Sequence, residues 1–154
     1  VVSLTKSVLP DMIKKKSGQI VTNTSLLGKF STKKRSVYSS AKHALHGFID
    51  ALRAEVYQHN IKVNTVAPGY VNTEVGINAL IENGTAYGKN DRGHKSKGMK
   101  VEKAVKIIIT AITNNKREVL VIPTFSTLMI ASLLTRFFPG LGAIIARNFD
   151  EDKQ

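Results

Sequence analysis

Apolar residues recur at steps of three and four in three separate stretches of the chain, which is the spacing of one face of an α-helix. The stretches cover residues 1–16, 37–59 and 101–114. The longest repeats its apolar side chains at Ala41, Leu45, Phe48, Leu52 and Val56. Each pattern predicts a helix with one face turned toward a core.

Between and after these helices lie three short runs rich in β-branched residues, which favour strands. They are 19–25 (QIVTNTS), 61–66 (IKVNTV) and 118–123 (EVLVIP). Strands that alternate with helices predict an α/β fold in which right-handed crossovers build a parallel sheet. Three strands are few for a doubly wound sheet of the Rossmann type. We therefore expect three strands with flanking helices that form the C-terminal half of such a sheet.

The predicted strands end in residues suited to binding. In parallel α/β sheets, ligands bind at the carboxyl ends of the strands. Here those ends carry Thr24-Ser25, Ala67-Pro68-Gly69 and Pro123-Thr124. The stretch from Val71 to Met99 has no clear period, and structureless loops of this length usually have a function. We expect a functional loop or a small lid there.

Charge adds one constraint on partners. The formal net charge is +12, from 23 Lys and Arg against 11 Asp and Glu. A nucleic-acid interface favours basic residues on one face with aromatic residues between them. The basic clusters instead fall at separate turns, and only 6% of the residues are aromatic. Charged loops in solvent are the favoured interpretation, attraction to anionic lipid or phosphorylated substrates is the alternative, and no nucleic-acid partner is expected.

Metal and thiol chemistry find little support. The chain has no cysteine, which excludes disulfides, thiolate ligands and a thiol nucleophile. Its four histidines lack metal-ligand spacing with carboxylates, so we expect them to be solvated or packed; they are His43, His46, His59 and His94. No metal site is predicted.

The stretch YSSAKHALHGF holds the first candidate chemistry. Tyr38 and Lys42 are four residues apart, so both side chains share one helix face. A nearby ammonium favours the phenolate form of a tyrosine. Such a pair can give a proton to a carbonyl oxygen or take one from an alcohol. By itself the spacing is common, and a packed tyrosine beside a solvated lysine is its more frequent explanation.

Two further features make the pattern specific. Ser25 lies thirteen residues before Tyr38, and PGYVNT places Thr73 four residues after Gly69. The serine, the Tyr-x-x-x-Lys pair and the Pro-Gly-x-x-x-Thr turn, in this order and spacing, resemble the short-chain dehydrogenase/reductase family. The resemblance extends over about residues 3–123.

The resemblance implies a role for each residue. Ser25 would hold the substrate oxygen, and Tyr38 would be the acid/base. Lys42 would support the phenolate and bind the nicotinamide ribose. Tyr38 and the turn after the second strand would line the cofactor site, with contributions from Pro68, Gly69, Val71 and Thr73. Ser25, Tyr38 and Lys42 are thus the expected catalytic residues of an NAD(P)-dependent oxidoreductase, and a homodimer through the Tyr38 helix is also expected.

The chain also departs from the family pattern. It has no Gly-x-x-x-Gly-x-Gly turn after a strand, no Asn-Ala-Gly run, and no residue that separates NAD from NADP. The family's catalytic asparagine would precede Val1. We therefore expect residues 1–123 to be the C-terminal catalytic part of a truncated enzyme that is inactive alone. Residues 124–154 would be a separate apolar tail.

The tail is apolar from Phe125 to Ala146 but is divided by Arg136 and Pro139-Gly140. Neither half reaches the roughly 20 residues of a spanning helix. A lid or subunit contact is one interpretation, and a piece lying in a membrane interface is the other. The tail resembles a membrane-associated subgroup of the same family. That resemblance implies lipid-like carbonyl substrates, NADP(H) rather than NAD(H), and the endoplasmic reticulum or peroxisome.

Two interpretations of function stay open at this point. One is the oxidoreductase described above, acting on a small carbonyl or alcohol. The alternative is a non-enzymatic membrane-surface or interaction module derived from a truncated dehydrogenase. A glycine-rich strand-turn-helix upstream would favour the enzyme.

Overall fold

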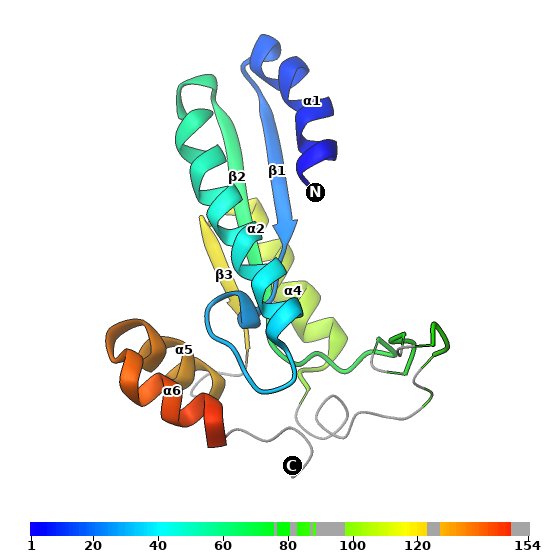
Figure 1. Cartoon of the computed structure of the whole chain (residues 1–154). Helices are drawn as coiled ribbons and strands as arrows, with labels where there is room; N and C mark the ends of the chain where they lie inside the picture. The colour runs from blue at the N-terminus through cyan, green and yellow to red at the C-terminus, as the bar shows by residue number, and fades with distance from the viewer. Residues whose placement is uncertain (76, 81–82, 87, 89–97, 123–126, 149–154) are drawn as a thin grey trace.

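The computed structural model describes residues 1–75, 77–80, 83–86, 88, 98–122 and 127–148. Its centre is a parallel sheet of three strands in the order β1-β2-β3, with helices on both faces (Figure 1). The strands are β1 (Gly18–Asn23), β2 (Ile61–Pro68) and β3 (Glu118–Val121). The predicted α/β architecture with three parallel strands is confirmed.

Among the described residues, three helices flank the sheet: α1 (Val2–Lys15), α2 (Ser36–Glu55) and α4 (Val101–Thr113). The helical patterns in the sequence predicted all three. The prediction for α2 was wrong in its last turn, because α2 ends at Glu55 and a short 3-10 helix, η2 (Tyr57–His59), follows. Asn60 then takes a left-handed conformation, with φ of 54°, which turns the chain into β2.

The alternation of side chains along β2 divides the core into two layers. Ile61 and Val63 pack with α1 and α2, in a cluster around Ile49 and Leu52 of α2. Val66 faces the other way and packs against α4 and β3. The middle strand is therefore covered on both faces, as the crossover connections of a parallel sheet require.

The strand ends differ from expectation by two residues. The first predicted strand extended through Ser25, but β1 ends at Asn23, and Ser25 begins the 3-10 helix η1 (Leu26–Gly28). Conversely, β2 continues through Pro68, which pairs with Val121. Proline is tolerated there because it is the last residue of the strand, and the next amide, Gly69 N–H, donates to the Val121 carbonyl at 3.1 Å.

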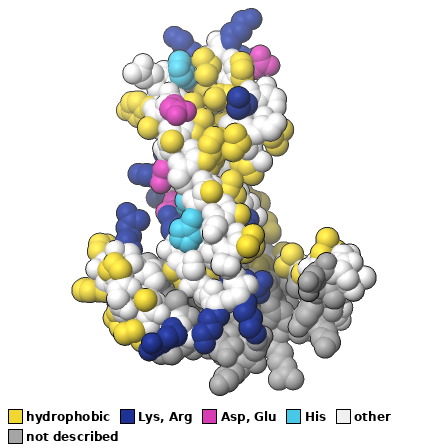
Figure 2. All heavy atoms as spheres, viewed as in Figure 1, with side chains coloured by type: hydrophobic (Ala, Val, Ile, Leu, Met, Phe, Trp, Pro, Cys, Tyr) yellow, Lys and Arg dark blue, Asp and Glu magenta, His cyan; other side chains and the backbone are white. Residues whose placement is uncertain are grey.

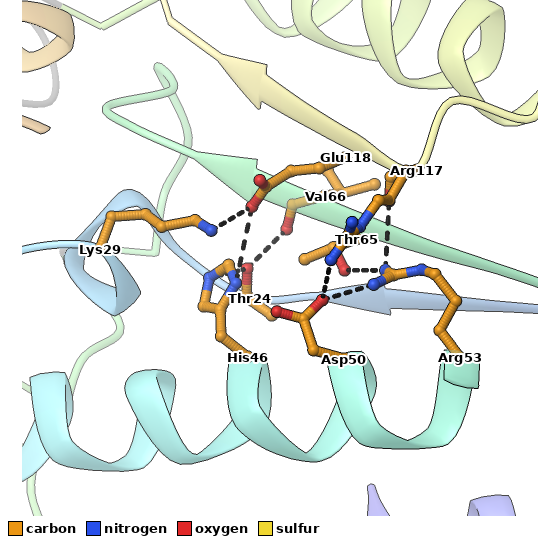
Figure 3. Close-up of polar contacts among 9 residues, drawn as sticks. All are labelled: Thr24, Lys29, His46, Asp50, Arg53, Thr65, Val66, Arg117 and Glu118. Carbon is orange, nitrogen blue, oxygen red and sulfur yellow. Dashed lines mark hydrogen bonds and ion pairs between the residues drawn. The ribbon is translucent and has the colours of Figure 1, made fainter. Parts of the chain in front are cut away.

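A polar network ties α2 to the edges of β2 and β3 (Figure 3). Arg53 donates to the Val63 carbonyl at 3.0 Å and to the Thr65 hydroxyl at 3.1 Å, and it pairs with Asp50 on its own helix. Arg117 reaches Asp50 at 3.2 Å. Burial opposes ionisation of Asp50, but hydrogen bonds from the two arginines outweigh it and hold the pKa of that carboxyl below its ordinary value. The helix is thus fixed in register over the sheet.

The tail forms two short helices, α5 (Thr127–Phe137) and α6 (Pro139–Asn148), which pack mainly against each other (Figure 1). We call residues 127–148 the C-terminal helical pair. Within the described ranges no helix is both long and apolar enough to cross a membrane. The expected boundary between residues 123 and 124 falls outside the described residues and stays a prediction.

Candidate active site

The residues singled out in the sequence lie at the carboxyl end of the sheet. Ser25 follows β1, Pro68 closes β2, and Tyr38 and Lys42 stand in the first two turns of α2. In Figure 1, η1 and the first turns of α2 lie at the end toward which the strand arrows point. This is the edge at which a parallel α/β sheet binds its ligands.

Ser25 is held by the start of η1. Its backbone is extended, and its Oγ accepts a hydrogen bond from the Leu27 amide at 3.1 Å, which makes it the N-cap of η1. The side chain is almost fully buried. The Leu27 amide donates to a lone pair of Oγ, so this contact does not use the hydroxyl proton. The Ser25 O–H can therefore still donate to a substrate oxygen.

Tyr38 and Lys42 are brought together as their spacing predicts. The Lys42 ammonium lies 5.5 Å from the centre of the Tyr38 ring, within the range of a cation–π contact. Tyr38 is 44% exposed, so its side chain remains open to a molecule outside the domain. The pair thus combines a proton-bearing phenol with a fixed positive charge on an accessible surface.

Gly28 lets η1 approach α2 closely. A Cβ at this position would lie 2.5 Å from His46 Cδ2 and 2.9 Å from the Lys42 carbonyl oxygen. Both distances are below any normal carbon contact. The segment that follows Ser25 therefore reaches the backbone of the helix that carries Tyr38 only because residue 28 has no side chain.

Replacing Gly28 with Ala is expected to lower the free energy of unfolding by about 1–3 kcal/mol, because the added methyl must displace η1 from α2. Urea unfolding measures the change. Gly47→Ala, on α2, is the matched control, since a Cβ there meets nothing within 4 Å. That control should gain up to about 1 kcal/mol from better helix propensity. A gain in both variants would contradict the close packing at Gly28.

The turn after β2 is held by backbone contacts. Val71 forms a bridge with Met99, and the Asn72 amide donates to the Met99 carbonyl at 2.9 Å. Pro68 and Gly69 are partly buried, whereas Thr73 is exposed and its hydroxyl accepts from the Val75 amide at 3.5 Å. The structure therefore places Pro68, Gly69 and Val71 at the edge of the sheet but leaves Thr73 in contact with its own loop. Much of the loop predicted between Val71 and Met99 lies outside the described residues.

Sequence reasoning gave no role to His46, which the structure places beside Thr24, the residue before Ser25 (Figure 3). Its Nε2 lies 3.1 Å from the Thr24 hydroxyl and its Nδ1 lies 3.6 Å from a Glu118 carboxylate oxygen. Lys29 pairs with the same oxygen at 2.7 Å. The only hint in the sequence was that His46 follows Lys42 by four residues and so shares its helix face.

The environment of His46 disfavours its charged form. Burial lowers its pKa, and the Lys29 charge lowers it further, while Glu118, a backbone hydrogen bond at Ser25, and Asp50 act in the opposite direction. The net pKa lies below the ordinary value of about 6.5. His46 is therefore neutral near pH 7.

Lowering the pH from about 7.5 to about 5.5 is expected to reduce the free energy of unfolding. Because the pKa of His46 is lower in the folded chain, the unfolded chain takes up the proton first as pH falls. This contribution is complete above about pH 6.5 and is lost as the pH falls toward the folded pKa. Urea unfolding at both pH values should show a smaller loss for His46→Gln than for the wild type. His59→Gln, in η2, is the control. If His46→Gln loses as much free energy of unfolding between the two pH values as the wild type does, the lowered pKa of His46 is refuted.

No group of three or more His, Asp or Glu in the described part of the chain could hold a metal ion.

Comparison with known proteins gives consistent matches. The family model described as short chain dehydrogenase matches residues 1–84. A dehydrogenase/reductase SDR family protein 7-like from Anopheles gambiae is 43% identical over 122 residues, which cover 79% of this chain and 38% of the relative. The dehydrogenase/reductase SDR family member 7B of Mus musculus is 39% identical over 144 residues, which cover 94% of this chain and 40% of the relative. The chain thus spans about two fifths of the length of these relatives.

Solved structures match the fold. A short-chain dehydrogenase from Streptomyces avermitilis aligns with a TM-score of 0.63 and 26% identity, over 92% of this chain and 54% of that one. A short chain dehydrogenase from Burkholderia cenocepacia, solved in complex with NADP, aligns with a TM-score of 0.69 and 18% identity, over 97% and 54% of the two chains.

Proposed function

The chain belongs to the short-chain dehydrogenase family, and on that premise we propose that it carries the catalytic residues of an NAD(P)-dependent oxidoreductase that interconverts a carbonyl and an alcohol. The observation that carries the proposal is the joint placement of three side chains at one end of the sheet. Gly28 lets the η1 segment that follows Ser25 pack on α2, and α2 presents Tyr38 with Lys42 beside it. A reacting oxygen at this edge would find two hydroxyl donors and a cation.

The roles follow from the chemistry of each group. In the direction of reduction, the Ser25 hydroxyl donates a hydrogen bond to the substrate carbonyl oxygen and orients it. The Tyr38 hydroxyl transfers its proton to that oxygen as the negative charge develops there. Lys42 stabilises the phenolate that remains, because its ammonium sits beside the ring. In the opposite direction the phenolate takes the proton from the alcohol.

The nicotinamide cofactor would supply or accept the hydride, and the protein would supply position and charge. The described residues fit such a group: Lys42 offers donors to ribose hydroxyls, and the turn at Pro68, Gly69 and Val71 lies at the same edge. Thr73 completes the proposed site from the adjoining loop. In this proposal the cofactor is NADP(H) rather than NAD(H), as the resemblance of the tail to a membrane-associated subgroup of the family implies.

The complete protein is proposed to be a full-length reductase in which residues 1–123 form the C-terminal catalytic part. In this proposal, the missing part of the sheet would pair with β1, whose described partner is β2 alone, and would hold the adenosine and phosphates of the cofactor. Support comes from the relatives, of which the chain covers about two fifths. A homodimer through α2 belongs to the same proposal.

A membrane surface is the proposed partner of the C-terminal helical pair. Its exposed side chains are largely apolar (Figure 2); they are Ile130, Leu133, Phe137, Phe138, Leu141 and Ile144. The only charged residues within 127–148 are Arg136 and Arg147. An apolar face with only positive charges fits anionic lipid better than an acidic or a purely apolar partner. Lipid-like carbonyl substrates, at the endoplasmic reticulum or the peroxisome, belong to this proposal because the resemblance of the tail to a membrane-associated subgroup of the family implies them.

One assay tests the central proposal against the non-enzymatic alternative. The complete protein, supplied with NADPH or NADH and a series of ketones and aldehydes of increasing chain length, is expected to oxidise NADPH preferentially. Ser25→Ala should lower kcat far more than it lowers stability, because loss of the η1 cap costs only about 1 kcal/mol. Absence of turnover with every carbonyl would favour the interaction module.

A further inference from the structure

His46 stands on the same face of α2 as the proposed acid/base. Tyr38, Lys42 and His46 follow one another at steps of four residues, so the face presents the three side chains in sequence along the helix. Whereas Tyr38 is open to solvent, His46 is buried against the end of β1. Its ring is therefore placed to contact the segment that leads into Ser25.

The hydrogen bonds at Thr24 define which nitrogen of His46 carries the proton. The Thr24 hydroxyl donates to the Val66 carbonyl at 2.9 Å, so its own proton is already engaged. The oxygen then accepts from His46 Nε2 at 3.1 Å. A neutral imidazole with the proton on Nε2 satisfies both contacts, and Nδ1 is left facing Glu118.

Charged groups lie on the other side of the ring (Figure 3). Glu118, the first residue of β3, lies 3.6 Å from Nδ1 and is itself paired with Lys29 at 2.7 Å. Lys29 directly follows η1, the helix that Ser25 caps. The imidazole thus links α2 to the end of β1, and Lys29 ties the segment after Ser25 to the Glu118 carboxylate beside the ring.

The hydrogen bond between His46 and Thr24 lies one residue before Ser25, the proposed catalytic serine. The Thr24 backbone amide also donates to the Val66 carbonyl, at 2.7 Å, so both donors of this residue are fixed to β2. His46 adds a side-chain contact that joins this fixed point to the helix of Tyr38 and Lys42. A displacement of about 1 Å in a reacting group can reduce a rate by about 100-fold.

We propose that His46 is a positioning residue, which holds Thr24 and with it Ser25 in register with Tyr38 and Lys42. The inference rests on the proposed oxidoreductase activity and assigns to His46 no contact with substrate or cofactor. A histidine that merely fills space would stabilise the fold without selectively affecting the step that needs Ser25.

The test compares substitutions in the complete protein. His46→Leu keeps the bulk but removes the donor, whereas His46→Gln keeps an N–H group near the Nε2 position. His46→Leu is expected to lower kcat about 10- to 100-fold with KM within about threefold, and His46→Gln to recover most of kcat. His59→Gln, on η2 at the opposite end of α2, is the matched control and should behave as the wild type.

The same substitution in a Ser25→Ala protein tests whether His46 acts on turnover through Ser25. In a Ser25→Ala protein, His46→Leu should lower kcat by less than about threefold, since there is no hydroxyl left to position. The proposal would be overturned if His46→Leu lowered kcat equally in the wild-type and Ser25→Ala proteins, or if His46→Leu alone kept the wild-type kcat. Unfolding by urea is measured for every variant, and failure of His46→Gln to restore kcat in a folded protein would also count against it.

Hydrogen exchange at the Leu27 amide gives a readout that needs no activity. This amide donates to Ser25 Oγ, so its protection reports whether Ser25 stays in place. Exchange should be faster by about tenfold or more in His46→Leu, and unchanged in His46→Gln and His59→Gln. Unchanged protection in His46→Leu would overturn the positioning role, whatever the enzyme does. Absence of turnover in the wild type would instead count against the proposed function alone.

Discussion

Replacing Tyr38 with Phe is expected to abolish nearly all turnover of the complete protein. The substitution keeps the ring beside Lys42 and removes only the hydroxyl, which is the proposed proton donor. General acid catalysis contributes about 10²–10⁴ in rate, so kcat should fall by at least about 100-fold. Steady-state kinetics with a water-soluble ketone and NADPH measure the change.

The affinity of Tyr38→Phe for NADPH shows whether the variant has lost only the proton donor or also its folded structure. The dissociation constant for NADPH should remain within about threefold in Tyr38→Phe, since Lys42 and the backbone turn at Gly69 are untouched. Tyr57→Phe is the matched control, because Tyr57 is highly exposed on η2, at the far end of α2. Turnover of Tyr38→Phe within a few-fold of the wild type would contradict the assignment of Tyr38 as acid/base.

Replacing four exposed apolar residues of the C-terminal helical pair with Ser is expected to release the protein from anionic liposomes. The residues are Leu133, Phe137, Phe138 and Leu141. Phe137 and Phe138 are 67% and 61% exposed, so most of their apolar surface is available to lipid. Burying such a side chain contributes on the order of 1.5–3 kcal/mol, so the four together should weaken partitioning by at least about 100-fold. Flotation with vesicles of zwitterionic and anionic lipid measures it, in proteins without any other membrane anchor.

The control replaces exposed apolar residues of another helix with Ser. Val105→Ser and Ile109→Ser alter exposed apolar residues of α4 and should leave flotation unchanged. Catalysis on a water-soluble ketone should persist in the four-residue variant. If the helical pair is instead a lid over the site, the variant should float like the wild type and show a raised KM for apolar substrates. Equal flotation would therefore rule out the membrane contact.

The sequence by itself determined the elements and the order in which they occur. The helical spacing of apolar residues and the runs of β-branched residues are local properties of the sequence. They located α1, α2, α4 and the three described strands to within a few residues. The Tyr38–Lys42 pair was equally predictable, since two residues four apart on a helix must share a face. The roles of Ser25, Tyr38, Lys42 and Thr73 came from a resemblance and stay predictions until the variants are measured.

Tertiary structure alone decided how the segments meet. Ser25 caps η1 instead of ending a strand, because the Leu27 amide needs an acceptor there and the ladder of β1 has already stopped at Asn23. Gly28 is favoured over a larger residue only because His46 and the Lys42 carbonyl lie opposite it. His46 itself looked like an ordinary histidine, since Thr24 is 22 residues away and Glu118 is 72 residues away along the chain. Such contacts join residues whose separation in sequence carries no periodicity, so they emerge only when the helix, the strands and η1 pack together.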